Sequence, residues 1–272
     1  MKAASTRLRE LLARENEILV LPGVYDGISA RIALNEGFDA LYMTGAGTSA
    51  SVLGQPDLAI VTLNDMVGNA GMIAGLDTRV PVIADADTGF GGAAMCARTT
   101  SLYCACRNQV QQKRCGHLSS KQLVPLEEYL VRIRAAANAR ATLESDIVII
   151  TRTDALAVAG FDEAIARAKA AVVAGADVAF IEGLTSRADA ERAVKELAPT
   201  PVLLNLATGG LTPELDCTRA KEMGFKLVYF PIKAQGTDIS ACGGLSVKGF
   251  FEMVGLNEVM AIDAQAGGAF KL

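Results

Sequence analysis

The sequence predicts an α/β fold built on a parallel sheet, either a closed (β/α)8 barrel or an open doubly wound sheet. Short apolar runs alternate along the chain with amphipathic segments of helix length. The runs are rich in Val, Ile and Leu without polar alternation, which is typical of parallel strands buried on both faces. With 272 residues, the chain has the length of one such domain. No Gly-x-Gly-x-x-Gly follows the first run, which weakens the nucleotide-binding open sheet.

The first segment mixes acidic and basic residues among its leucines, so we expect a surface helix rather than a signal or transit peptide. Apolar runs predict strands at Ile18–Pro22, Ala40–Thr44, Pro81–Asp87, Ile147–Asp154, Val178–Glu182, Pro201–Leu206 and Lys226–Pro231. Apolar residues at helical spacing predict helices at Met95–Cys106, Phe161–Ala174 and Arg187–Leu197. Gly37, Gly175 and Gly224 precede strands and suit left-handed helix ends.

One strand is missing from this alternation of predicted strands and helices. After Pro81–Asp87 the expected helix Met95–Cys106 runs directly into the polar stretch Asn108–Cys115. No apolar run of strand length follows before residue 124. A barrel formed by this chain would therefore lack its fourth strand.

Composition excludes several functions. Lys and Arg total 26 against 30 Asp and Glu, a net charge of −4, which argues against a nucleic-acid surface. The apolar runs are too short to cross a bilayer, so no membrane partner is expected. The single histidine, His117, rules out a multi-histidine zinc site. Six cysteines without a Cys-x-x-Cys pair favour a reducing compartment; we expect the cytoplasm, with mitochondrion and peroxisome left open.

Two acids, Asp85 and Asp87, end the third predicted strand. Alternate residues of a strand point the same way, so both carboxylates would project together, about 6–7 Å apart. At the C-terminal end of a parallel barrel, such a pair suits a hard cation such as Mg²⁺, directly or through its waters. The alternative is a pair of loop acids, one of which caps a helix.

The segment Lys113–His117 places a thiol, Cys115, beside two cations and an imidazole. These neighbours should lower the pKa of the thiol, which makes it a usable general acid or base. The alternative is a polar loop with an incidental cysteine, in which His117 is a structural hydrogen-bond donor.

Three further strand ends carry polar side chains: Arg152, Glu182 and Asn205. The guanidinium fork of Arg152 would bind a substrate carboxylate through two hydrogen bonds. Taken singly, each of these residues is more often part of a salt bridge or a cap. Together, at equivalent ends of successive strands, they favour a site.

Six segments, in order, resemble the isocitrate lyase/phosphoenolpyruvate mutase superfamily. They are Leu21–Gly27, Tyr42–Gly47, Asp85–Gly92, Lys113–His117, Thr151–Ala155 and Phe180–Gly183. The resemblance extends from Arg7 to Phe230. The Lys-Arg-Cys-Gly-His segment after Asp-Ala-Asp-Thr-Gly-Phe-Gly-Gly points to the lyase and hydrolase branches.

The resemblance implies one (β/α)8 barrel domain over residues 1–272, usually a homotetramer. Residues 245–272, with helices at Leu245–Val254 and Asn257–Ala264, would form a tail that members exchange between neighbours. The barrel would be incomplete or distorted around its fourth strand and its eighth helix, because Lys233–Gly244 is short and glycine-rich. No acid occurs between Asp87 and Glu127, where relatives carry a metal-supporting Glu, and Thr208 stands where they tend to carry a second one.

The resemblance also implies roles for the site residues. Mg²⁺, with Mn²⁺ as the alternative, would sit beside Asp85, with Asp87 and Asp57 reached through waters. Cys115 would move a proton, in a mobile loop with Gly116 and His117. The substrate would be bound by Tyr42, Thr44, Gly45, Ala46, Gly116, Arg152, Glu182 and Asn205.

The leading functional expectation is a Mg²⁺-dependent carbon–carbon lyase acting on a small 2-hydroxy di- or tricarboxylate of the methylisocitrate or dimethylmalate type. An oxaloacetate hydrolase is the second enzyme, since that branch shares the cysteine loop and the Val24–Arg31 segment. The missing strand also suggests an alternative from another class of protein: a non-catalytic relative that binds carboxylates weakly or serves as a partner subunit.

Overall fold

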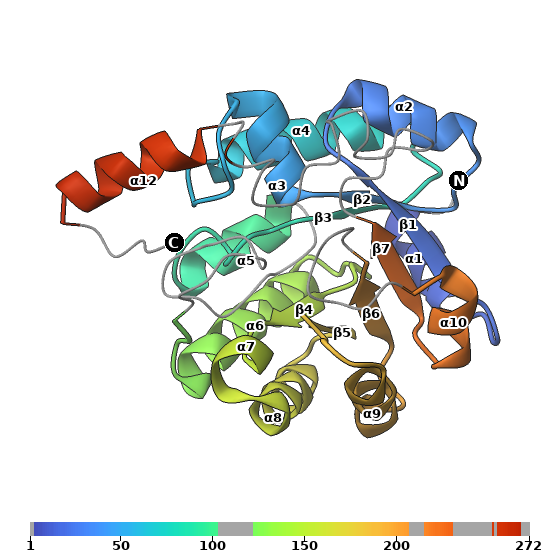
Figure 1. Cartoon of the computed structure of the whole chain (residues 1–272). Coiled ribbons are helices and arrows are strands. Elements are labelled where there is room, and N and C mark those ends of the chain that lie inside the picture. Colours follow the sequence, from blue (N-terminus) through green and yellow to red (C-terminus); the bar gives the residue numbers. More distant parts are fainter. Residues whose placement is uncertain (1–2, 103–121, 207–214, 231–251, 253–254, 268–272) are drawn as a thin grey trace.

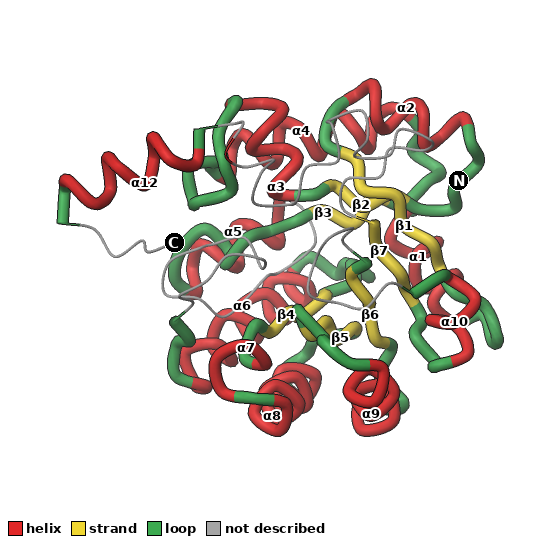
Figure 2. The backbone as a smooth tube through the Cα atoms, in the orientation of Figure 1, coloured by secondary structure: helices red, strands yellow, loops and turns green. Residues whose placement is uncertain are grey.

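A computed structural model describes residues 3–102, 122–206, 215–230, 252 and 255–267 of the protein. Its centre is a curled sheet of seven parallel strands with helices on its outer side (Figures 1 and 2). All seven predicted strands are confirmed, each within about three residues of the expected ends. The strands are β1 Leu19–Val24, β2 Leu41–Met43, β3 Val82–Ala84, β4 Ile150–Thr153, β5 Val178–Ile181, β6 Val202–Asn205 and β7 Leu227–Phe230.

The sheet is open where the fourth strand was expected to be missing. The strand order is β3-β2-β1-β7-β6-β5-β4, so β3 and β4 lie at the two ends. Among the described residues, no strand joins the outer edges of these two strands. In the part of the chain that the structure describes, the fold is therefore an incomplete, distorted (β/α)8 barrel, as predicted. The expected defect at the eighth helix, Lys233–Gly244, lies outside the described residues.

Helices alternate with the strands around the sheet. The helices are α1 Ala4–Ala13, α2 Gly27–Asn35, α3 Gly45–Thr48, η1 Ser49–Leu53, α4 Leu63–Leu76, α5 Ala93–Leu102, α6 Leu126–Thr142, α7 Leu156–Ala159, α8 Phe161–Val173, α9 Arg187–Leu197, α10 Cys217–Glu222 and α12 Leu256–Gln265. The expected helices at α1, α8, α9 and α12 are confirmed. So is the described part of Met95–Cys106, whereas Leu245–Val254 lies outside the description except for Glu252. No described helix is both long and apolar enough to cross a membrane.

The predicted glycine helix ends are also confirmed, with φ of +80° at Gly37, +117° at Gly175 and +91° at Gly224. After α8, the Ala176 N–H donates to the Ala171 carbonyl at 3.1 Å, a hydrogen bond that spans five residues. This pattern satisfies carbonyls at the helix end and turns the chain toward the next strand.

The interior of the curled sheet is filled by inward-facing side chains such as Leu21, Phe180 and Leu227. Helix α1 lies across the N-terminal end of this core and adds Leu8 and Leu11 to it. Separate clusters fill the spaces between the strands and the outer helices. Apolar side chains therefore fill both the interior of the sheet and the layer between the sheet and its helices.

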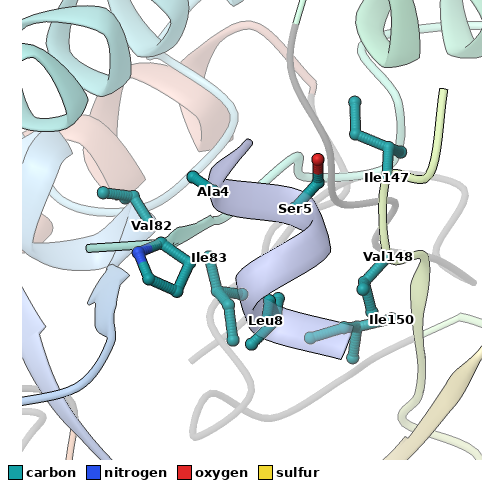
Figure 3. A pocket seen from close by; sticks show the side chains of 9 residues that line it. Ala4, Ser5, Leu8, Val82, Ile83, Ile147, Val148 and Ile150 are labelled. Carbon is teal, nitrogen blue, oxygen red and sulfur yellow. The ribbon is translucent and has the colours of Figure 1, made fainter. Parts of the chain in front are cut away.

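Helix α1 also bridges the N-terminal end of the gap between β3 and β4. A cavity of about 130 Å³ lies there, lined by residues of α1, residues 81–83, and Ile147, Val148 and Ile150 (Figure 3). On the β4 side, Ser5 and Thr6 donate hydrogen bonds to the Asp146 carboxylate. Arg9 donates to the Ile147 carbonyl at 2.9 Å. Farther along the same gap, α5 packs against α6.

We expect the contact between α1 and Asp146 to make stability depend on pH. Hydrogen bonds from Ser5 and Thr6 lower the pKa of Asp146 in the folded protein. A lowered folded-state pKa stabilises the fold above the unfolded-state value of about 3.9, and this part is lost as the pH falls through the folded-state pKa. Asp146→Asn should therefore lower the Tm at pH 7 by about 2–4 °C, and the difference from wild type should shrink as the pH falls below about 3.9.

Thermal unfolding of both proteins between pH 3 and pH 7 measures this. Asp39→Asn, at a half-exposed ion pair with Arg7, is the control and should change the Tm by less than about 1 °C. A Tm difference for Asp146→Asn that stays constant across this range would contradict the assignment.

Candidate active site

The predicted polar residues lie at the C-terminal ends of neighbouring strands. Thr44 follows β2, and Asp85 follows β3. Arg152 is the next-to-last residue of β4, Glu182 follows β5, and Asn205 is the last residue of β6. The ends of parallel strands meet at one edge of a curled sheet, so these groups share one end of the molecule. This end is opposite the one covered by α1.

Asp85 is fully buried and links two strand ends. Its Oδ2 accepts a hydrogen bond from the Gly45 N–H at 3.0 Å, and its Oδ1 accepts one from the Asp87 N–H at 2.9 Å. The carboxylate is thereby fixed in orientation. The Gly45 amide, expected to contact substrate, is used for this link.

Asp87 does not continue the strand. β3 ends at Ala84, and Asp87 has φ of +54°, so the alternation that placed both acids on one strand face was wrong for Asp87. The chain turns there because the Asp87 N–H bonds back to Asp85 and the Asp87 carboxylate accepts from the Thr88 N–H at 2.7 Å. Asp87 is nevertheless buried beside Asp85.

Helix α5 holds this turn in place. The Thr99 hydroxyl donates to the Gly89 carbonyl at 3.1 Å, and the Cys96 thiol lies 3.7 Å from the Thr88 carbonyl. Burial raises the pKa of Cys96, so this thiol stays protonated and acts as a donor rather than as a nucleophile. Gly89, at φ of +81°, packs against Cys96.

The third predicted acid, Asp57, is buried in the segment between η1 and α4. Within the described ranges, no three or more His, Cys, Asp and Glu side chains are placed to hold one metal ion. Asp57, Asp85 and Asp87 therefore do not form a direct three-ligand set. Buried carboxylates at this end nevertheless fit Mg²⁺, which keeps several waters and binds proteins through one or two carboxylates.

Arg152 belongs to a buried network that crosses three strands. Its Nε and Nη2 donate to the two oxygens of Asp154 at 3.0 and 2.9 Å. Its Nη1 lies 2.9 Å from Glu182 Oε2. The Asn205 amide nitrogen donates to Glu182 at 3.2 Å. In the part of the chain that the structure describes, the Asn205 Oδ1 is buried without a hydrogen-bond partner.

Asp154 was not among the predicted site residues. The signal for it lay in the Thr-Arg-Thr-Asp segment, because residues two apart at a strand end can face the same side. We predicted that Arg152 pairs with a substrate carboxylate. We did not predict that its guanidinium already contacts two carboxylates of the protein, those of Asp154 and Glu182.

The other predicted residues lie around this centre or beyond the described chain. Tyr42 is in the barrel interior, stacked on Tyr229 with ring centroids 3.8 Å apart. Thr44 caps α3 and accepts from the Gly47 N–H, and Ala46 is half-buried. Residues outside the described ranges are Lys113, Arg114, Cys115, Gly116, His117 and Thr208.

Comparison with known proteins identifies relatives along most of the chain. The model of the family described as phosphoenolpyruvate phosphomutase matches residues 8–242. The 2,3-dimethylmalate lyase of Eubacterium barkeri is 39% identical over 234 residues, which cover 84% of this chain and 79% of that protein. The 2-methylisocitrate lyase of Aeropyrum pernix is 39% identical over 232 residues, which cover 83% and 73%.

Solved structures give the same grouping. The crystal structure of a 2,3-dimethylmalate lyase has a TM-score of 0.85 and 49% identity, covering 99% of this chain and 97% of that one. Oxaloacetate acetylhydrolase, in complex with the inhibitor 3,3-difluorooxalacetate, has a TM-score of 0.84 and 45% identity, covering 99% of each chain.

Proposed function

The chain belongs to the phosphoenolpyruvate mutase/isocitrate lyase superfamily, and from this premise we propose that it is a Mg²⁺-dependent carbon–carbon lyase. The substrate would be a small 2-hydroxy di- or tricarboxylate of the dimethylmalate or methylisocitrate type. The observation that carries the proposal is the oriented, buried Asp85 at the same sheet end as the buried cation of Arg152.

The reaction can be written for 2,3-dimethylmalate. The C2 hydroxyl loses its proton, the C2–C3 bond breaks, and C2 becomes the keto carbon of pyruvate. The electron pair of that bond goes to C3, which takes a proton and yields propionate. Mg²⁺ held by Asp85, with Asp87 and Asp57 acting through waters, would supply positive charge beside the 2-hydroxy carboxylate.

The side chains of this protein would divide the remaining work. Arg152 would hold a substrate carboxylate, with Glu182 and Asn205 beside it. Tyr42, Thr44 and Ala46 would contact the part that becomes the keto acid. The Cys115 thiol would give its proton to C3, and Gly116 and His117 would belong to the loop that closes over the substrate.

A second candidate is an oxaloacetate hydrolase, favoured by the 45% identity to oxaloacetate acetylhydrolase over nearly the whole chain. Water would then be a reactant, and oxaloacetate would give acetate and oxalate. The relatives named above are enzymes, and the non-catalytic alternative gains no support from them.

The assembly would be a homo-oligomer, a tetramer by resemblance. Helix α12 extends away from the barrel (Figure 1), and its Ile262 side chain is 67% exposed. A helix that projects from the barrel has faces on which a neighbouring copy could pack. This supports a tail shared between subunits.

Product analysis tests the function. Purified protein with Mg²⁺ is given 2,3-dimethylmalate, 2-methylisocitrate and oxaloacetate in turn, and each keto acid, oxalate and acetate is quantified. We expect cleavage of one of the first two and loss of activity with EDTA. Cleavage of oxaloacetate alone would favour the hydrolase, and no turnover of any of the three would overturn both enzymes.

Cys115→Ala tests the proton donor. Loss of a general acid should lower kcat by about 100-fold or more. Cys217→Ala, which removes a half-buried thiol from the start of α10, is the matched control and should retain wild-type kcat. Unchanged turnover in Cys115→Ala would remove that residue from the mechanism.

A further inference from the structure

We propose that Asp154 is a positioning residue that fixes the Arg152 guanidinium for a substrate carboxylate. The inference rests on the proposed function and adds to it a residue that has no role in the scheme above. Asp154 directly follows β4, and its side chain points to the same side as that of Arg152, two residues before it. Both residues are buried.

The geometry of the pair fixes an orientation rather than only a charge. Asp154 takes two parallel hydrogen bonds from Nε and Nη2, the side edge of the guanidinium. Two bonds to one carboxylate define the plane of the fork, whereas one bond would let it rotate. Glu182 contacts Nη1, and the Phe180 ring lies 5.2 Å from the guanidinium carbon.

The neighbours of Arg152 are themselves held. Glu182 accepts hydrogen bonds from Asn205 through both of its oxygens, at 3.2 and 3.4 Å. The chain of contacts therefore runs from Asp154, just after β4, through Arg152 and Glu182 to Asn205 on β6. A shift of the guanidinium would disturb every member of this network.

This arrangement sets the edge that Arg152 can offer. With the side edge bound to Asp154 and Nη1 in contact with Glu182, the guanidinium would meet a substrate carboxylate in one fixed orientation. Asp154 itself would touch no reacting atom. A carboxylate held equally before and during bond cleavage contributes to KM more than to kcat, so loss of the positioning should act mainly on KM.

A purely structural ion pair makes a different prediction, and the chain contains one for comparison. Arg140 and Asp177 also join the segments around β4 and β5, but at the opposite end of the strands. There the Asp177 carboxylate accepts from the Ile149 N–H at 2.7 Å. Asp177→Asn should lower the Tm and leave KM unchanged.

The experiment compares wild type, Asp154→Asn and Asp177→Asn. KM and kcat are measured on whichever substrate the wild type cleaves, and Tm is measured on all three proteins. We expect Asp154→Asn, which keeps one acceptor oxygen, to raise KM about tenfold with kcat within about threefold. Asp154→Ala, which keeps none, should raise KM further; if it does not fold, Asp154→Asn decides alone.

A binding measurement separates this inference from the proposed function. Titration of oxalate with Mg²⁺, followed by calorimetry, needs no turnover, and the Kd of Asp154→Asn should also rise about tenfold. A KM and Kd that stay unchanged or fall would overturn the role of Asp154 while leaving the lyase intact. A wild type that neither binds oxalate nor cleaves any substrate would overturn both.

Discussion

Asp85→Ala is expected to lower turnover at least about 1,000-fold and to destabilise the fold. The proposed metal would lose its direct carboxylate ligand. In addition, the buried N–H groups of Gly45 and Asp87 would lose the acceptor that each has now. An unsatisfied buried donor costs about 1–3 kcal/mol, so the two together cost about 2–6 kcal/mol.

Asp85→Asn separates the two effects, because the amide keeps one acceptor oxygen but no negative charge. It should lose turnover like the alanine variant and keep more of the stability. The measurements are kcat/KM and the Tm with and without Mg²⁺; the metal should raise the Tm of wild type and of neither variant.

Asp162→Asn, at an exposed ion pair with Arg192, is the control and should behave as wild type in both measurements. Turnover in Asp85→Asn above about one tenth of wild type would contradict the role given to Asp85, since loss of a direct metal ligand should cost far more.

Gly89→Ala is expected to lower stability by about 3 kcal/mol, a fall in Tm of about 10 °C, through two separate causes. Gly89 has φ of +81°, a conformation that costs an alanine about 1–2 kcal/mol. A Cβ at this position would lie 2.2 Å from the Cys96 sulfur and 3.3 Å from the Cys96 Cα, so the Cys96 side chain, the turn or α5 must shift. Since this turn carries Asp87, kcat/KM should fall as well.

Companion variants isolate each cause. Gly54→Ala has φ of +63° and nothing within 4 Å of the new Cβ, so it should show only the backbone cost. Gly92→Ala, in the same turn with open space around it, should be nearly neutral. Adding Cys96→Ala should restore part of the Tm of Gly89→Ala; a double variant no more stable than the single one would mean that the clash is not the cause.

The sequence predicted the strands well because each is a short, continuous apolar run, which is typical of a parallel strand buried on both faces. It also located the opening of the described sheet between β3 and β4, since the absence of an apolar run after Asp87 is as visible as the presence of such runs elsewhere. The glycines before β2, β5 and β7 were predicted for the same local reason: only glycine readily adopts a left-handed helix end.

The contacts inside the site could be predicted only in part. Arg152, Glu182 and Asn205 were found because they stand at strand ends, but pairing across strands depends on register and side-chain reach, which the sequence does not encode locally. Asp154 was missed for another reason: it lies just beyond β4, where strand alternation alone does not show that its carboxylate pairs with Arg152. The turn at Asp87 was missed because it depends on a hydrogen bond to Asp85 that competes with continued strand geometry.

The opening between β3 and β4 separates the proposed metal ligand from the arginine proposed to bind the substrate carboxylate. Asp85 follows β3 and Arg152 lies on β4, and no described strand stitches these two edges together. A ligand that contacts both groups would connect the two edge strands of the sheet, as backbone hydrogen bonds do in a complete barrel. The rigidity of the region around β3 and β4 would then depend partly on bound substrate.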